Sequence, residues 1–113
     1  MIENKLRWLL QGWHASMVAA DEVHYLAEKW LSEEEWVELP KEDPGSVVFE
    51  VLAQLDILNQ QLIIQDDVPA LLSFMETGKE DALLAWRTWE DYWEGVDLKA
   101  RQIILSGDPT YAC

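Results

Sequence analysis

The chain has 113 residues, half of them apolar, and 22 Asp and Glu against 8 Lys and Arg give it a net charge of −14. A phosphate backbone or an anionic membrane attracts proteins through Lys and Arg, so this charge argues against nucleic acid and membranes as partners. Seven tryptophans exclude an intrinsically disordered acidic tail, because disordered segments are poor in aromatic residues.

Length and composition predict one folded domain over residues 1–113. A chain of this length buries roughly two-thirds of its unfolded surface, which is enough for a core without metal or disulfide. The single cysteine, Cys113, cannot form a disulfide within the chain. No apolar run approaches the roughly 20 residues that cross a bilayer, and the first residues lack the pattern of a signal peptide. We therefore expect a cytoplasmic protein.

Apolar residues recur every three or four positions in most of the chain, which predicts helices. Residues 2–13 carry the first apolar stripe, and Gly12 is a plausible end for that helix. Asp21 is positioned to cap a second helix, whose buried face runs from Val23 to Leu31.

Residues 32–46 interrupt this pattern, because two prolines and a glycine lie there among carboxylates. This segment predicts a long acidic loop, with one helical turn at residues 32–35. Ser46 then opens a third helix, whose apolar stripe begins at Val48 and ends at Leu62.

The second half of the chain predicts three further helices. Asp66-Asp67-Val68-Pro69 starts the fourth, because an acidic cap precedes a proline in the first turn, and Thr77-Gly78 ends it. The fifth spans about 80–94, a short sixth follows the capping residue Asp97, and residues 106–113 form a tail. No strand pattern persists. The sequence therefore predicts an all-α fold, a compact bundle of five or six short helices.

The chain shows no pattern typical of catalysis. No serine lies in a nucleophile elbow, and the glycines are isolated instead of forming a phosphate-binding loop. Asp21, His24 and Glu28 share one helix face, but no Glu-x-x-His pair accompanies them, so a metal-dependent enzyme is only a third hypothesis. We expect a protein that is not an enzyme and that has no cofactor or bound metal.

The negative charge is concentrated in the middle of the chain. Residues 1–31 sum to −1, residues 32–56 to −7 and residues 57–113 to −6. An exposed aromatic residue beside carboxylates is typical of an interface centre, where the aromatic residue anchors and the charges steer. We expect Trp36 to be such an exposed residue in the acidic loop. The candidate partner-binding residues are Glu33, Glu34, Glu35, Trp36, Glu38, Glu42 and Asp43.

A second aromatic group lies on the predicted fifth helix. Trp86, Trp89 and Trp93 follow helical spacing in line with Leu83, and such a stripe usually faces the core. The stripe is also the alternative location for an interface, because a chain of this size cannot easily bury all seven tryptophans.

The chain resembles the small helical immunity proteins encoded beside bacterial polymorphic or contact-dependent toxins. The resemblance lies in Leu55-Asp56-Ile57-Leu58 leading into Asp66-Asp67-Val68-Pro69-Ala70-Leu71-Leu72-Ser73-Phe74-Met75. The Tyr-Tyr-Pro recognition turn of the colicin-nuclease immunity proteins has no counterpart here, so no individual binding residue is carried over. The resemblance implies a cytoplasmic inhibitor that binds a cognate toxin tightly.

Two functional hypotheses rank ahead of the metal-dependent enzyme. The first is a binding protein that neutralises a basic protein partner, most concretely an immunity protein acting on a toxin domain. The second is a helical adaptor or regulatory subunit without a toxin partner, which could form a homodimer to bury its excess tryptophans.

Overall fold

The structure is a computed structural model that describes residues 2–33 and 35–111. Over these residues it contains seven α-helices and no strand, so the predicted all-α fold is confirmed. The helices are α1 (Ile2–His14), α2 (Ala20–Glu33), α3 (Pro44–Asp56), α4 (Leu58–Gln61), α5 (Val68–Glu80), α6 (Ala82–Glu94) and α7 (Leu98–Leu105). A 3-10 turn, η1 (Gln65–Asp67), precedes α5. The short α4 is the helix beyond the expected five or six, because the third apolar stripe is split at Ile57.

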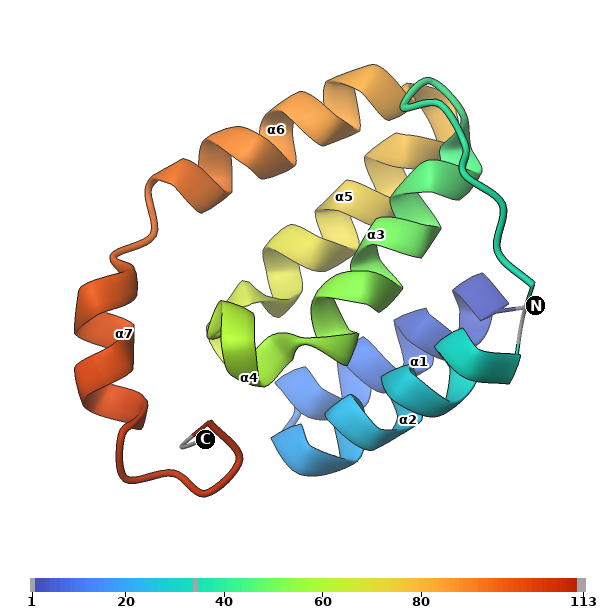
Figure 1. Cartoon of the computed structure of the whole chain (residues 1–113). Coiled ribbons are helices and arrows are strands. Elements are labelled where there is room, and N and C mark those ends of the chain that lie inside the picture. The colour runs from blue at the N-terminus through green and yellow to red at the C-terminus, as the bar shows by residue number, and fades with distance from the viewer. Residues whose placement is uncertain (1, 34, 112–113) are drawn as a thin grey trace.

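Two central helices, α3 and α5, organise the bundle. In Figure 1 they lie side by side, with α1 and α2 below them, α6 crossing above, and α7 standing apart on the left. Apolar side chains of α1, α3 and α5 form most of the core. These include Leu6, Leu9, Leu10, Val51, Leu52, Leu55, Leu71, Phe74 and Met75. None of the helices in the described ranges is long and apolar enough to cross a membrane.

Several helix ends differ from the sequence-based prediction. Helix α1 continues past Gly12 to His14, and α2 starts at Ala20 instead of being capped by Asp21. Helix α3 starts two residues before Ser46, because the Asp43 side chain accepts a hydrogen bond from the Gly45 N–H. The acidic loop is therefore shorter than predicted, and its described part between α2 and α3 spans residues 35–43.

Gly78 does not end the fourth predicted helix, since α5 continues to Glu80. Gly78 is buried at the contact between α5 and α3. A Cβ at this position would lie 2.9 Å from both methyl carbons of Val47. The glycine therefore permits a close approach of two helices, which is a packing role that its position in the sequence does not reveal.

Asp67 was expected to cap α5, but its side chain makes no capping hydrogen bond there. It is fully buried, and it accepts hydrogen bonds from the Ile64 N–H and the Tyr92 hydroxyl. The Arg101 guanidinium donates to both carboxylate oxygens, at 2.6 and 2.8 Å. These contacts connect the start of α5 to α6 and α7. A buried carboxylate requires such a set of donors, because its desolvation is costly.

Helix α7 contributes no buried residue to the core. The C-terminal segment is therefore held to the body by individual side-chain contacts. Arg101 also donates to the Leu62 carbonyl oxygen at 3.0 Å and lies over the Trp93 ring. Beyond α7, the buried Tyr111 hydroxyl donates to the Ile63 carbonyl oxygen at 2.6 Å. The predicted tail is thus fixed to the body at Tyr111.

The pKa values of Tyr92, Tyr111 and Arg101 are all raised by their surroundings. Burial, with the hydrogen bond to Asp67, raises the pKa of Tyr92, and burial raises the pKa of Tyr111. The hydrogen bond to Asp67 raises the pKa of Arg101. Arg101 is therefore charged, and both tyrosines are neutral hydrogen-bond donors, throughout the physiological range.

Replacing Gly78 by alanine should destabilise the protein. The added methyl group overpacks the α3–α5 contact, which typically costs about 1–3 kcal/mol, and the better helix propensity of alanine offsets only part of this. Urea unfolding of Gly78→Ala, Val47→Ala and the double variant would measure the effect. We expect the double variant to be more stable than the sum of the single changes predicts. Additive changes would contradict the contact.

Replacing Arg101 by methionine should lower the free energy of unfolding by about 3 kcal/mol, because it leaves the Asp67 carboxylate buried and unpaired. Hydrogen exchange should show faster exchange of the α7 amides than in the native protein. Lys99→Met on the same helix is the matched control, since Lys99 is exposed and should be dispensable. Equal stability of the two variants would show that the ion pair does not hold α7.

Candidate functional site

The acidic loop passes over the N-terminal end of α3 and reaches α6. Figure 1 shows it at the upper right, between the end of α2 and the start of α3. Lys41 in the loop pairs with Glu90 of α6 at 2.9 Å, and its ammonium lies 4.8 Å from the centre of the Trp86 ring. The loop is thus attached to the bundle at its middle.

The predicted carboxylates that the structure describes fall into three groups: those without an ion pair, Glu33 beside a lysine, and Asp43. Glu35, Glu38 and Glu42 are exposed and, in the part of the chain that the structure describes, form no ion pair. Glu33 is exposed and lies 3.9 Å from Lys29, and Glu34 lies outside the described residues.

Asp43 makes up the third group. Its side chain accepts from the Gly45 N–H at 2.8 Å, so it serves as the cap of α3. Asp43 therefore has a local structural role. The sequence pattern grouped it with the partner-binding carboxylates because its neighbours are acidic.

Trp36 does not project into solvent, contrary to the expectation that it is exposed in the loop. Its indole N–H donates to the Leu31 carbonyl oxygen at 3.0 Å, near the end of α2. Its ring is half-buried and packs against Phe49, with 5.1 Å between ring centroids. Unsatisfied carbonyl groups at a helix end attract such donors, which explains the inward position.

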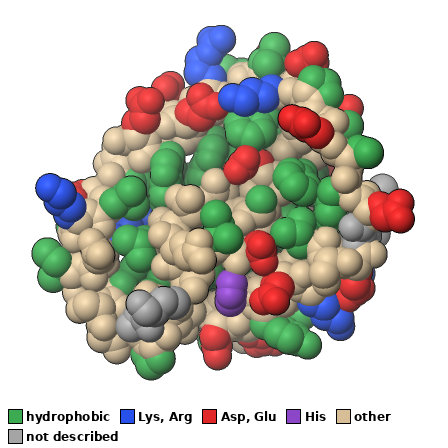
Figure 2. Space-filling view, in the orientation of Figure 1, with side chains coloured by type: hydrophobic (Ala, Val, Ile, Leu, Met, Phe, Trp, Pro, Cys, Tyr) green, Lys and Arg blue, Asp and Glu red, His purple; other side chains and the backbone are tan. Residues whose placement is uncertain are grey.

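The apolar groups that the loop region does expose are Val37, Leu39 and Phe49, with 75%, 37% and 37% of their surface accessible. Val37 and Leu39 lie in the loop, where isolated apolar residues carry no periodic signal, and Phe49 lies on α3 outside the predicted apolar stripe. The sequence pattern therefore did not point to them. In the upper right of Figure 2, carboxylates and hydrophobic side chains lie next to each other on this face.

Two hollows flank Leu39. The first has a volume of about 270 Å³ and lies between the loop and α1, α3 and α5. Its apolar lining consists of Ile2, Trp36, Leu39, Pro44, Val48 and Met75. The second has a volume of about 260 Å³, and its apolar lining consists of Val37, Leu39, Phe49 and Trp86. Leu39 is therefore a ridge between two apolar hollows.

The position of this ridge depends on Gly45. A Cβ at Gly45 would lie 2.7 Å from a terminal methyl carbon of Leu39, so only glycine leaves room for the leucine side chain as it stands. The sequence pattern predicts Gly45 in the loop, whereas the structure places it in the first turn of α3 beneath the ridge.

The cations near the hollows are engaged with other groups. Lys79, at the rim of the first hollow, lies 3.6 Å from Glu3 and 3.7 Å from Glu76. Lys41, at the rim of the second, is paired with Glu90. The field over the surface is therefore set by the unpaired loop carboxylates.

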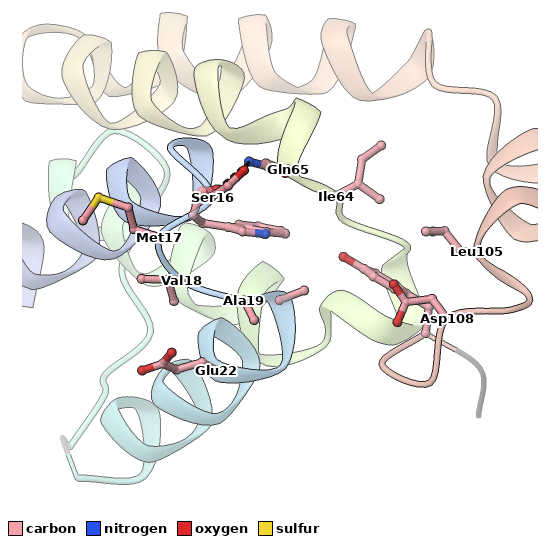
Figure 3. Close-up of a pocket in the computed structure, with 12 residues that line it drawn as sticks. Ser16, Met17, Val18, Ala19, Glu22, Ile64, Gln65, Leu105 and Asp108 are labelled. Atoms are coloured by element: carbon pink, nitrogen blue, oxygen red, sulfur yellow. Dashed lines mark hydrogen bonds between the residues drawn. The ribbon is translucent and has the colours of Figure 1, made fainter.

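A larger hollow, with a volume of about 630 Å³, lies between the α1–α2 turn and the C-terminal tail. In Figure 3, Glu22 and Asp108 approach it from opposite elements. The Gln65 amide nitrogen donates to the Trp13 and His14 carbonyl oxygens. It also lies 2.9 Å from the Ser16 hydroxyl, beside which it is labelled in Figure 3. The Gln65 amide thus provides a hydrogen-bond donor to the carbonyl groups at the end of α1. The polar groups of this hollow join structural elements, and we do not assign them to a binding site.

The metal hypothesis for Asp21, His24 and Glu28 is not supported. Over residues 2–33 and 35–111, no group of three His, Cys, Asp or Glu side chains is placed to hold a metal ion. The Asp21 carboxylate accepts from the Glu22 N–H, and His24 Nδ1 lies 3.4 Å from the Leu55 carbonyl oxygen.

The tryptophan stripe of α6 mainly faces the core. Trp89 is buried and stacks on Phe74, with ring centroids 5.6 Å apart and an interplanar angle of 2°. Trp86 and Trp93 are half-buried, and the Trp86 N–H donates to the Ser46 hydroxyl at 2.9 Å. Leu83, predicted on the same stripe, is exposed. The stripe thus offers less free surface than the loop.

Comparison of this chain with protein-family models, curated proteins and solved structures found no match.

Replacing Asp43 by alanine should destabilise the protein by about 1 kcal/mol, because α3 loses its N-terminal cap. Glu42→Ala is the matched control: it removes the same charge from an adjacent exposed side chain and should leave stability nearly unchanged. Thermal or urea unfolding of both variants would check this. An equal loss in both would mean that Asp43 acts only through its charge.

Proposed function

We propose that this chain is a non-catalytic, cytoplasmic binding protein that neutralises a basic protein, as an immunity protein neutralises its cognate toxin. The observation that carries the proposal is the exposed, unpaired set Glu35, Glu38 and Glu42 beside an apolar surface. Carboxylates that pair with nothing in their own protein are available to a cationic partner.

The net charge of −14 supports the same conclusion. A charge of magnitude about 2–8 is ample for the solubility of a small domain, and a larger excess destabilises the compact state through self-repulsion. A basic partner relieves that repulsion on binding. This relief of repulsion favours binding, and it adds to the free energy of the contacts made at the interface.

The mode of action follows from the charges. A toxin that acts on nucleic acid or another anionic substrate presents a cationic surface, and the loop carboxylates compete for it. Long-range attraction steers the approach, with association rates of up to about 10⁸–10⁹ M⁻¹s⁻¹ at low salt.

A second candidate function is that of a homodimeric adaptor, and α7 is the observation in its favour. Ile103 and Ile104 have 76% and 77% of their surface accessible, and α7 contains no acidic residue. Two copies could meet there without repulsion between carboxylates of that helix. Sedimentation at micromolar concentration separates the hypotheses, because the adaptor self-associates and the inhibitor alone does not.

The genetic test uses the adjacent reading frame. Its product should be toxic when expressed alone and harmless when this chain is co-expressed. A harmless neighbour, or toxicity that co-expression does not relieve, would contradict the assignment as an immunity protein.

The charge on the loop should control association with that product. Reversing Glu35 and Glu38 to lysine should slow association about tenfold at low salt and flatten its salt dependence, because steering is lost. Stopped-flow tryptophan fluorescence at low and high salt would measure both quantities.

The matched control reverses Asp91 and Glu94, two exposed carboxylates of α6, to lysine. It lowers the net negative charge by the same amount but leaves the loop intact. Equal slowing in the loop and control variants would reject the loop as the steering surface, since only the net charge would then matter.

A further inference from the structure

The two hollows beside Leu39 have firmly held walls. Met75 in the first is 1% exposed, and Trp36 is fixed there by its hydrogen bond to the Leu31 carbonyl oxygen. In the second, Trp86 is held by its hydrogen bond to Ser46, which is itself buried. Preformed walls lower the ordering cost of binding, so these hollows are suited to accept a group from outside.

The size of each hollow limits what it can accept. Pockets for whole small molecules usually measure about 300–1,000 Å³, and these hollows fall below that range. Their volumes of about 270 and 260 Å³ fit one large side chain each. The first is lined mainly by apolar side chains, and the second combines apolar walls with Glu38, Lys41, Ser46 and Glu50. Apolar side chains fit against the apolar walls of both.

Charge determines the chemistry around those side chains. Glu38 lines the second hollow, and Glu35 and Glu42 stand exposed on the same loop. The neighbouring cations Lys41 and Lys79 already pair with carboxylates. A segment that covers both hollows therefore meets uncompensated negative charge at their edges.

We propose that the loop binds a basic segment of the partner protein that inserts two apolar side chains, one on each side of Leu39. Lys or Arg residues next to them pair with Glu35, Glu38 and Glu42. The anchoring side chains thus come from the partner, while this chain supplies the hollows and Trp36 forms a wall. The inference rests on the proposed function only in taking the partner to be a basic protein.

Two synthetic peptides of equal positive charge test the inference on the full chain. One carries two leucines among lysines, and the other carries serines in their place. The leucine peptide should bind about tenfold more tightly or better, because burial of even one leucine side chain contributes that much. Calorimetry measures the affinities, and ¹H–¹⁵N NMR locates the contact, expected at residues 36–49.

A pair of matched variants links the preference to the ridge. Leu39→Ser should weaken binding of the leucine peptide about tenfold and leave the serine peptide unaffected, because only the apolar contact is lost. Leu84→Ser removes a leucine of similar exposure from α6, outside both hollows, and should change neither affinity.

Three outcomes would overturn the inference. They are equal affinity for the two peptides, NMR shifts centred on Ile103 and Ile104 instead of the loop, and self-association that Leu39→Ser abolishes. Failure of the proposed function is distinguishable. If the adjacent gene product is harmless but the peptide preference holds, the docking surface stands without the immunity role. If co-expression protects the cell and the Leu39→Ser variant protects equally well, the immunity role stands without the docking surface.

Discussion

Asp67 has no solvent-accessible surface, yet it carries the charge that positions the C-terminal third of the chain. Its carboxylate accepts hydrogen bonds from Arg101, from Tyr92 and from the Ile64 N–H. Because a buried charge is stable only with a complete set of donors, α6 and α7 must lie where those donors reach it. Because α7 itself contributes no buried residue, the pair between Arg101 and Asp67 is a main attachment of this helix to the body.

The scarcity of cations shapes the rest of the surface. Of the eight Lys and Arg residues, all within the described ranges, only Arg87 and Lys99 lack an ion pair or a contact with an aromatic ring. Five of the other six join different elements, as Lys41 joins the loop to α6, whereas Lys29 pairs with Glu33 within α2. Most carboxylates in the described ranges therefore form no ion pair. The proposed basic partner would supply the charge that the fold itself cannot.

The proposed binding surface separates two tasks. Exposed carboxylates act at long range and provide attraction that depends on salt, whereas the hollows beside Leu39 act only at contact. The hollows are formed by side chains that also support the core, such as Met75 and Trp86. A rigid apolar surface with a charged edge favours one orientation of a partner, which charge alone would not specify.

Local chemistry determined the helices, because apolar spacing and capping depend on residues a few positions apart. Leu6, Leu9 and Leu10 are buried as their spacing predicted, and Asp97 caps α7 as expected. The sequence also determined the charge and its concentration near the loop. Only the tertiary structure decided the roles of Asp67, Gly78 and Leu39. Asp67 pairs with a residue 34 positions away, Gly78 is required by the approach of Val47 from α3, and Leu39 becomes a ridge through contact with α3. Such contacts leave no periodic trace in the sequence, because they join segments that only packing brings together.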